Sequence, residues 1–239
     1  MLNTVLMDLD GTLLPFEQQE FIDVYFKLVC KELVPKGYAP DAIVKAVWTG
    51  TKAMMKNDGS VLNHTRFWEA FVEWMGESVR EEEKTLDAFY DGDFHGVRSV
   101  LRGQRPAKEL VQTLREKGYT VVLATNPIFP EVAVRARLSW AGLKPEDFDH
   151  VTHYQNSRFC KPNPAYYREI LDTIGKTPDE CLMIGNSVPE DMEAAGAVGI
   201  KTYLVTGFLE NPEQKPIDTY DRGSLEEFAA IVKTWDPVK

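Results

Sequence analysis

The sequence has few cysteines, no long apolar run and no excess of positive charge. Its three cysteines, Cys30, Cys160 and Cys181, are far apart and form no CxxC or Cys/His cluster. This spacing excludes a disulfide framework and a zinc knuckle, and it favours a reducing compartment. No apolar stretch approaches the ~20 residues that a membrane span requires, and the first residues lack the basic region of a signal peptide. We therefore expect a cytoplasmic protein without a membrane role.

Basic residues are outnumbered by acidic ones, 27 to 37, which gives a net charge of −10. Proteins that bind nucleic acid or anionic membranes normally present a basic face, so neither partner is expected. A small anionic substrate is still allowed, because one site can be positive within an acidic protein. Glycine and proline, 16 and 14 of 239 residues, are too few for a low-complexity chain.

The apolar pattern changes its period twice along the chain. Residues 3–7 form a short apolar run that predicts a buried strand. Residues 16–98 show helical spacing, with helices expected at 21–33, 41–55, 65–75 and from 81. From residue 99 strands and helices alternate, which is typical of βαβ units. The strands are expected at 119–124, 150–154, 181–184 and 200–205, and the helices at 106–117, 130–143, 164–174, 189–198 and 225–235.

This pattern predicts an α/β fold with a Rossmann-like parallel sheet and an inserted helical cap domain. The core domain would comprise residues 1–15 and 99–239, and the cap residues 16–98. Ligands of open α/β sheets bind beyond the carboxyl ends of the strands. The polar residues that follow each expected strand are therefore the candidates for function.

Two carboxylates, Asp8 and Asp10, follow the first expected strand. A buried pair so close together is costly unless a cation or a ligand is present. One carboxylate could attack an electrophile while the other gives or takes a proton. Their position favours catalysis over a purely structural turn.

Polar residues follow later strands as well. Thr125 and Asn126 come after the strand at 119–124 and could bind the oxygens of an anion. Lys161 lies between that strand and the helix at 164–174, next to prolines that restrict its backbone, and a lysine suits phosphate. Oxygen ligands for a hard cation such as Mg²⁺ follow the strand at 181–184; these are Asn186, Glu190 and Asp191. Ser187 and Glu190 could equally form a helix capping box.

The order of these fragments resembles the haloacid dehalogenase (HAD) superfamily, in its phosphoglycolate phosphatase-like form with a type 1 helical cap. The matching segments are DLDGTL (8–13), ATN (124–126), KPNPAYY (161–167) and GNSVPED (185–191). The first segment is the most specific. The resemblance covers nearly the whole chain, including the position of the helical insert.

The resemblance implies a Mg²⁺-dependent phosphatase that acts on a small phosphorylated metabolite. Asp8 would be the nucleophile that forms an aspartyl-phosphate, and Asp10 the acid and base, with its carbonyl on Mg²⁺. Thr125 and Asn126 would hold phosphoryl oxygens, and Lys161 would neutralise negative charge. The metal site would comprise Asp8, Asp10, Asn186 and Asp191. Asp10 also argues against dehalogenation, because dehalogenases of the superfamily typically carry a non-acidic residue there.

One residue departs from the family pattern. Asn186 stands where the first acidic residue of the fourth segment is usual, and an amide oxygen ligates Mg²⁺ without contributing charge. Two alternatives to the phosphatase remain. A phosphomutase of the β-phosphoglucomutase kind would return the phosphoryl group to another carbon of the substrate. A non-catalytic protein of the same fold would use the pocket for binding only.

Overall fold

The computed structural model describes residues 1–238 and contains a six-stranded sheet in the order β3-β2-β1-β4-β5-β6. Every neighbouring pair of strands is parallel. Since β1 lies between β2 and β4, the carboxyl ends of these three strands share one edge. The α/β fold class is thereby confirmed. The strands are β1 (Thr4–Met7), β2 (Thr120–Leu123), β3 (His150–Val151), β4 (Cys181–Gly185), β5 (Lys201–Val205) and β6 (Asp221–Gly223).

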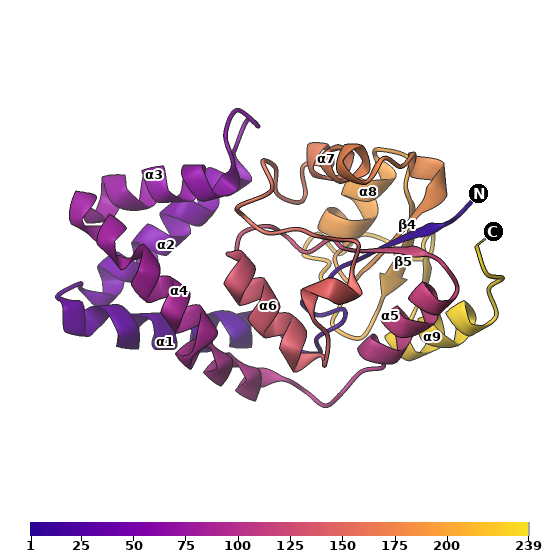
Figure 1. Cartoon of the computed structure of the whole chain (residues 1–239), viewed down its shortest axis with the longest axis horizontal. Helices are drawn as coiled ribbons and strands as arrows, with labels where there is room; N and C mark the ends of the chain where they lie inside the picture. The colour runs from indigo at the N-terminus through magenta and orange to yellow at the C-terminus, as the bar shows by residue number, and fades with distance from the viewer. Residues whose placement is uncertain (239) are drawn as a thin grey trace.

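Helices cover both faces of the sheet (Figure 1). Alternate residues of a strand point to opposite faces. Val5 and Met7 therefore pack in one core cluster with α5 (Ala107–Glu116) and α9 (Leu225–Lys233). Leu6 packs in a second cluster with α7 (Pro164–Ile174) and α8 (Ala194–Gly196). All three side chains are fully buried, and each such burial stabilises the fold by roughly 1.5–3 kcal/mol.

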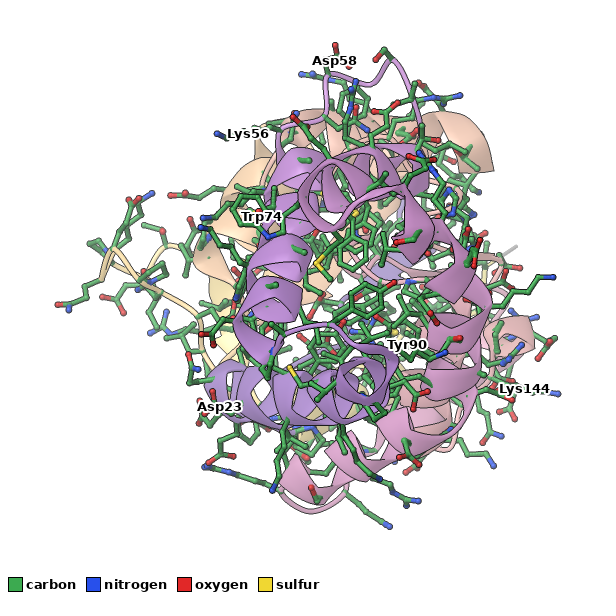
Figure 2. All side chains as sticks on the ribbon, turned by 90° about the vertical axis from the view of Figure 1, so that its left-hand side faces the viewer. Asp23, Lys56, Asp58, Trp74, Tyr90 and Lys144 are labelled. Carbon is green, nitrogen blue, oxygen red and sulfur yellow. The ribbon has the colours of Figure 1, made fainter. Side chains whose placement is uncertain are left out.

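A group of helices joins β1 to β2, as the helical spacing of residues 16–98 predicts. Figure 1 shows these helices beside the sheet, with α6 (Glu131–Trp140) between them and the strands. Figure 2 looks onto them and shows side chains gathered around Tyr90, with Lys56 and Asp58 at the periphery. The helices are α1 (Gln18–Leu33), α2 (Pro40–Met55), α3 (Asn63–Met75) and α4 (Glu83–Asp91), with 3₁₀ segments η1 (Val34–Lys36), η2 (Glu77–Glu82) and η3 (Asp93–Val100).

Three details differ from the sequence-based expectation. β6 was not expected, because its residues are polar and partly exposed. The helix expected at 189–198 is instead a π-helical turn, η6 (Val188–Glu193), followed by α8. The turn is wide because the Ser187 carbonyl accepts hydrogen bonds from the N–H groups of both Asp191 and Met192. The strand expected at 150–154 ends at Val151. Two further 3₁₀ turns, η4 (Pro145–Asp147) and η5 (Pro178–Glu180), complete the set of elements.

No helix within residues 1–238 combines the length and apolar character needed to cross a bilayer.

Candidate active site

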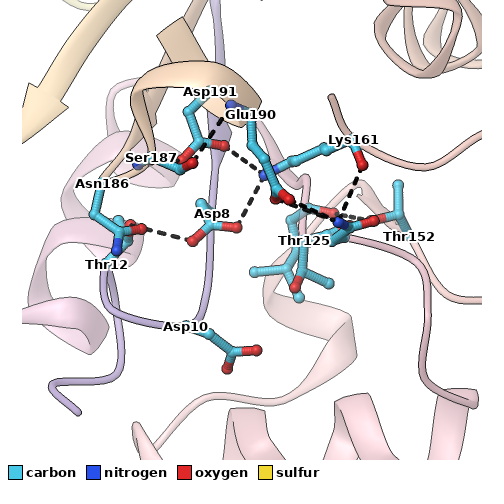
Figure 3. Close-up of polar contacts among 12 residues, drawn as sticks. Asp8, Asp10, Thr12, Thr125, Thr152, Lys161, Asn186, Ser187, Glu190 and Asp191 are labelled. Atoms are coloured by element: carbon cyan, nitrogen blue, oxygen red, sulfur yellow. Dashed lines mark hydrogen bonds and ion pairs between the residues drawn. The ribbon is translucent and has the colours of Figure 1, made fainter. Parts of the chain in front are cut away.

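Most of the predicted site residues lie together at the carboxyl edge of the sheet; Figure 3 shows Asp8, Thr125, Lys161, Asn186 and Asp191 there. Asp8 directly follows β1, Thr125 follows β2 and Asn186 directly follows β4. Because these strands are parallel neighbours, their ends deliver the three side chains to one place. Lys161 arrives from the loop that precedes α7, and Asp191 from η6.

Lys161 connects the first, third and fourth sequence segments. Its Nζ lies 2.9 Å from Asp8 Oδ1 and 2.6 Å from Asp191 Oδ1. The Lys161 side chain is fully buried. Burial by itself lowers the pKa of this ammonium group, but the Asp191 and Asp8 carboxylates outweigh that effect and leave the pKa well above normal. Lys161 is therefore a permanent positive charge beside Asp8.

The side chain of Asp191 is held by the backbone at the start of η6, the π-helical turn to which Asp191 belongs. Asp191 Oδ2 accepts a hydrogen bond of 3.0 Å from the Ser187 N–H. Gly185 lies against this carboxylate, and a Cβ at that position would collide with it. The expected capping box is only half formed, because Ser187 Oγ accepts from the Glu190 N–H but Ser187 N–H donates to Asp191. Both oxygens of Asp191 thus have partners, one of which is Lys161.

The side chain of Asn186 has a defined orientation. Its Nδ2 donates to the Phe208 carbonyl at 2.6 Å. Its Oδ1 therefore faces the other way, 3.1 Å from the Thr12 hydroxyl, which also lies 3.2 Å from Asp8 Oδ2. Gly11 passes so close to the Asn186 amide that a Cβ would collide with it. The structure thus holds an amide oxygen and a carboxylate oxygen around one hydroxyl.

Asp10 lies away from the Lys161 cluster (Figure 3). Its Oδ2 accepts a hydrogen bond from Nη1 of Arg137. Arg137 belongs to α6, and its side chain is only 1% exposed. Arg137 also lies over the ring of Phe129, 4.5 Å from its centroid. Burial raises the pKa of the Asp10 carboxyl; Arg137 opposes this shift without cancelling it, and Asp8 adds to it. A carboxyl with a raised pKa is suited to donating a proton.

Thr125 and Asn126 follow β2, as predicted, and both line the site. The Thr125 carbonyl accepts from the Thr152 hydroxyl at 2.7 Å and from the Tyr166 hydroxyl at 2.8 Å, which holds the backbone in place. The side-chain N–H of Asn126 donates to Glu190 and to the Lys161 carbonyl. The amide group of Asn126 therefore links neighbouring loops.

The site holds more carboxyl groups than cationic groups. Five carboxyl groups gather near two cations, Lys161 and Arg137; they belong to Asp8, Asp10, Glu190, Asp191 and Glu210. Burial raises the pKa of Glu190 to about 7, although Lys161 opposes the shift. Burial and the surrounding carboxylates raise the pKa of Glu210 to about 8. Such repulsion is relieved by a bound cation.

The oxygen donors in the site fit Mg²⁺ in chemistry. They include the Asp8 carboxylate and the Asn186 amide oxygen, which both lie next to the Thr12 hydroxyl and are hard ligands of the kind Mg²⁺ prefers. Within residues 1–238, no three His, Cys, Asp or Glu side chains converge to form a metal site by themselves. This is compatible with an ion that keeps several waters and uses substrate oxygens.

A cavity of about 320 Å³ extends from these polar residues into the helices that join β1 to β2. Its polar end is lined by Asp8, Asp10, Thr125 and Asn186, and its other end by apolar side chains of α1 to α4. The site is thus a cleft between the sheet edge and the inserted helices.

Sequence reasoning did not identify Arg137 or Glu210 as site residues. Arg137 carried a recognisable signal, because it shares a helix face with the apolar residues Ala133 and Trp140, at positions i−4 and i+3. An arginine on a buried face requires a partner, and that partner is Asp10. Glu210 lies in a loop after β5 whose sequence has no regular pattern.

The chain is similar to proteins of known family. The model of the haloacid dehalogenase-like hydrolases matches residues 2–199. The chain is 27% identical over 209 residues to the pyrophosphatase PpaX of Bacillus cereus, a match that covers 87% of this chain and 85% of the relative. It is 25% identical over 227 residues to the phosphoglycolate phosphatase of Aquifex aeolicus, covering 93% and 94% of the two chains.

Solved structures share the fold at lower identity. A HAD phosphatase from Thermococcus onnurineus aligns with a TM-score of 0.60 at 20% identity, covering 99% of this chain and 100% of the other. The L-2-haloacid dehalogenase of Xanthobacter autotrophicus aligns with a TM-score of 0.56 at 17% identity, covering 98% and 99%. The match of the family model over most of the sequence places the chain in a family of enzymes: this protein is a member of the haloacid dehalogenase-like hydrolases.

Proposed function

We propose that the protein is a Mg²⁺-dependent phosphatase that hydrolyses a small phosphomonoester through an aspartyl-phosphate on Asp8. The observation that carries this proposal is the contact of Lys161 with both Asp8 and Asp191. It joins the nucleophile, a fixed positive charge and the fourth sequence segment in one place. The names of the relatives from Bacillus cereus and Aquifex aeolicus support phosphate chemistry.

In the first step, a carboxylate oxygen of Asp8 forms a bond to phosphorus and the bond from phosphorus to the ester oxygen breaks. Asp10, as the neutral acid, donates its proton to the leaving oxygen and becomes a carboxylate. The raised pKa of Asp10 supports this role. Lys161 offsets the repulsion between the Asp8 carboxylate and the phosphate, and electrostatic stabilisation of this kind is the main catalytic task in phosphoryl transfer.

In the second step, Asp10 accepts a proton from water while the water oxygen bonds to phosphorus. The bond between phosphorus and Asp8 then breaks, which releases inorganic phosphate and restores both carboxyl groups. Arg137 would hold the Asp10 carboxylate in place during both proton transfers. Thr125 and Asn126 would bind phosphoryl oxygens from the end of β2.

Mg²⁺ would be held by the Asp8 carboxylate, the Asp10 carbonyl and the Asn186 amide oxygen. When bound, it would supply positive charge against the phosphoryl oxygens and orient them for attack. Asp191 would complete the metal site chiefly by holding Lys161, since both of its oxygens already have partners.

Residues 16–98 would act as a cap over a core of residues 1–15 and 99–239, excluding bulk water during the first step. The second candidate, a phosphomutase, shares every group described above and differs in the acceptor of the phosphoryl group. The hydrolase names of the relatives support water as the acceptor. Incubation with a hexose 1-phosphate distinguishes the two, because a mutase would yield a 6-phosphate and a hydrolase free phosphate.

The proposal is tested by measuring phosphate release from a panel of phosphomonoesters with Mg²⁺, for the wild type and for Asp8→Asn. We expect turnover by the wild type only. Rapid quenching followed by peptide mass spectrometry should detect a phosphoryl group on Asp8. Wild-type turnover no higher than that of Asp8→Asn over the whole panel would refute the proposal.

A further inference from the structure

The far end of the active-site cavity has an apolar, largely aromatic wall. It extends between the inserted helices and is lined there by Phe21, Phe26, Trp48, Phe67, Trp68 and Phe71, among others. Asp8 lines the same cavity, so this space is available to whatever is attached to the phosphoryl group. The chemistry of the wall therefore selects the alcohol part of the substrate.

The cavity offers no positive charge to a second anionic group. Of the residues that line it, within the chain as described to residue 238, none is Lys, Arg or His. Cationic groups that contact lining residues are already paired: Lys161 with Asp8 and Asp191, Arg137 with Asp10, and His64, when protonated, with Glu83. A substrate tail that carries a carboxylate or another phosphate would lose its hydration without gaining a partner.

Two acidic residues strengthen this discrimination. Glu83 and Asp87 lie one turn apart on α4 and both line the cavity. Burial, followed by the negative charge of Glu83, raises the pKa of Asp87. Because Asp87 is exposed and Glu83 contacts His64, these carboxyl groups add only a screened repulsion against anionic tails.

Several polar groups of the wall are engaged with one another. The hydroxyls of Tyr25 and Tyr90 lie 2.9 Å apart and share a hydrogen bond. Glu83 pairs with His64. Within residues 1–238, the indole N–H of Trp68 is buried without a hydrogen-bond partner. Sugar hydroxyls would have to reach this group or displace the existing hydrogen bonds, and each one buried without a hydrogen bond would weaken binding.

From this lining we infer that the enzyme acts on phosphomonoesters of uncharged, largely apolar alcohols, aromatic or aliphatic. The inference rests on the proposed phosphatase function and narrows it to a substrate class. That class differs from the pyrophosphate and phosphoglycolate in the names of the relatives, both of which are small and strongly anionic. Apolar tails gain affinity from the area that they bury against the aromatic wall.

A homologous series of alkyl phosphates tests the inference cleanly, because ethyl, butyl and hexyl phosphate have nearly the same leaving group. We expect kcat/KM with Mg²⁺ to rise about fourfold for each methylene buried. Phenyl and 1-naphthyl phosphate should follow the same trend. A flat or falling alkyl series, or a higher kcat/KM for phosphoglycolate, pyrophosphate or glucose 6-phosphate than for hexyl phosphate, would overturn it.

Charge reversal at the wall gives a second, independent measurement. Asp87→Lys should raise the ratio of kcat/KM for phosphoglycolate to that for hexyl phosphate by about tenfold, which is the effect of one favourable partly screened charge. Ala88→Lys is the matched control, because Ala88 is exposed on the same helix and does not line the cavity. The inference fails if both variants change the ratio equally or if neither changes it.

Failure of the proposed function is recognised separately. If no phosphomonoester is turned over above Asp8→Asn, the phosphatase proposal fails. The inference about the apolar part of the ligand can then still be tested by measuring binding. Calorimetry with Mg²⁺ would then compare ethylphosphonate, hexylphosphonate and phosphonoacetate. We expect hexylphosphonate to bind most tightly; tighter binding of phosphonoacetate would contradict the inference.

Discussion

Arg137 donates a hydrogen bond to Asp10, although 126 residues separate them in the sequence. The guanidinium is buried in α6 beneath the ring of Phe129, whereas about a third of the Asp10 side chain is exposed. The carboxyl group of Asp10 therefore faces the cavity, while Arg137, which holds it, is fixed by the surrounding packing. A proton donor that is held in this way needs little reorganisation during the reaction.

Replacing Arg137 should affect the proton transfers more than substrate binding. In Arg137→Met the opposing positive charge is lost, so the pKa of Asp10 should rise further. Since kcat/KM requires protonated Asp10, its decline at high pH should move to higher pH, with kcat lowered about 10- to 100-fold. Arg135→Met is the control, because Arg135 is exposed and forms its ion pair with Asp91, away from Asp10. Unchanged pH profiles in Arg137→Met would exclude the positioning role.

Removal of Lys161 should damage both stability and activity. Lys161→Met leaves Asp8 and Asp191 as buried like charges, which should lower the free energy of unfolding by about 3–5 kcal/mol. It should also lower kcat by at least about 100-fold. Urea denaturation and steady-state kinetics measure the two effects. In Lys215→Met, which breaks partly exposed pairs with Glu193 and Glu213, the loss should stay below about 1 kcal/mol; equal losses in both variants would contradict the prediction.

Asn186→Asp should restore the charge that is usual at this position and tighten Mg²⁺ binding by about tenfold or more, as one added charge near a cation predicts. Without Mg²⁺ the same variant should unfold more easily, since another carboxylate joins the cluster and the donor to the Phe208 carbonyl is lost. Calorimetric titration with Mg²⁺ and urea denaturation in EDTA check these outcomes. An unchanged affinity would mean that residue 186 does not face the cation.

The stability of the metal-free protein should fall as pH rises from about 4.5 to about 8. The folded-state pKa values of Glu190 and Glu210 are raised to about 7 and about 8, from 4.5. In this window the folded state binds more protons than the unfolded state, so the free energy of unfolding decreases with pH. Below the window these two groups are protonated in both states, and above it they are ionised in both, so they contribute no slope there.

Glu210→Gln should flatten this pH dependence, and saturating Mg²⁺ should do the same in the wild type by offsetting the negative charge. Urea denaturation in EDTA at several pH values measures the slope. Glu213→Gln serves as the control, because Glu213 is mostly exposed beside Lys215. A slope that persists in Glu210→Gln, or that vanishes equally in Glu213→Gln, would refute the assignment to Glu210.

The sequence by itself determined the fold class, most element positions and most members of the candidate site, though not Arg137 or Glu210. Strand and helix periods are local properties, so the alternation after residue 99 predicts a parallel sheet. In such a sheet, polar residues that follow β1, β2 and β4 must meet at one edge. The pattern alone therefore predicts three site residues, Asp8, Thr125 and Asn186. The matching segments 161–167 and 185–191 predict the other two, Lys161 and Asp191.

Only the tertiary structure decided which partners these residues have. The contact of Arg137 with Asp10 depends on how α6 packs against the site, and the contact of Asn126 with Glu190 depends on the wide turn of η6. The wall of the cavity depends on how α1 to α4 close around it. Such contacts join distant parts of the chain through packing, for which a local sequence period carries no information.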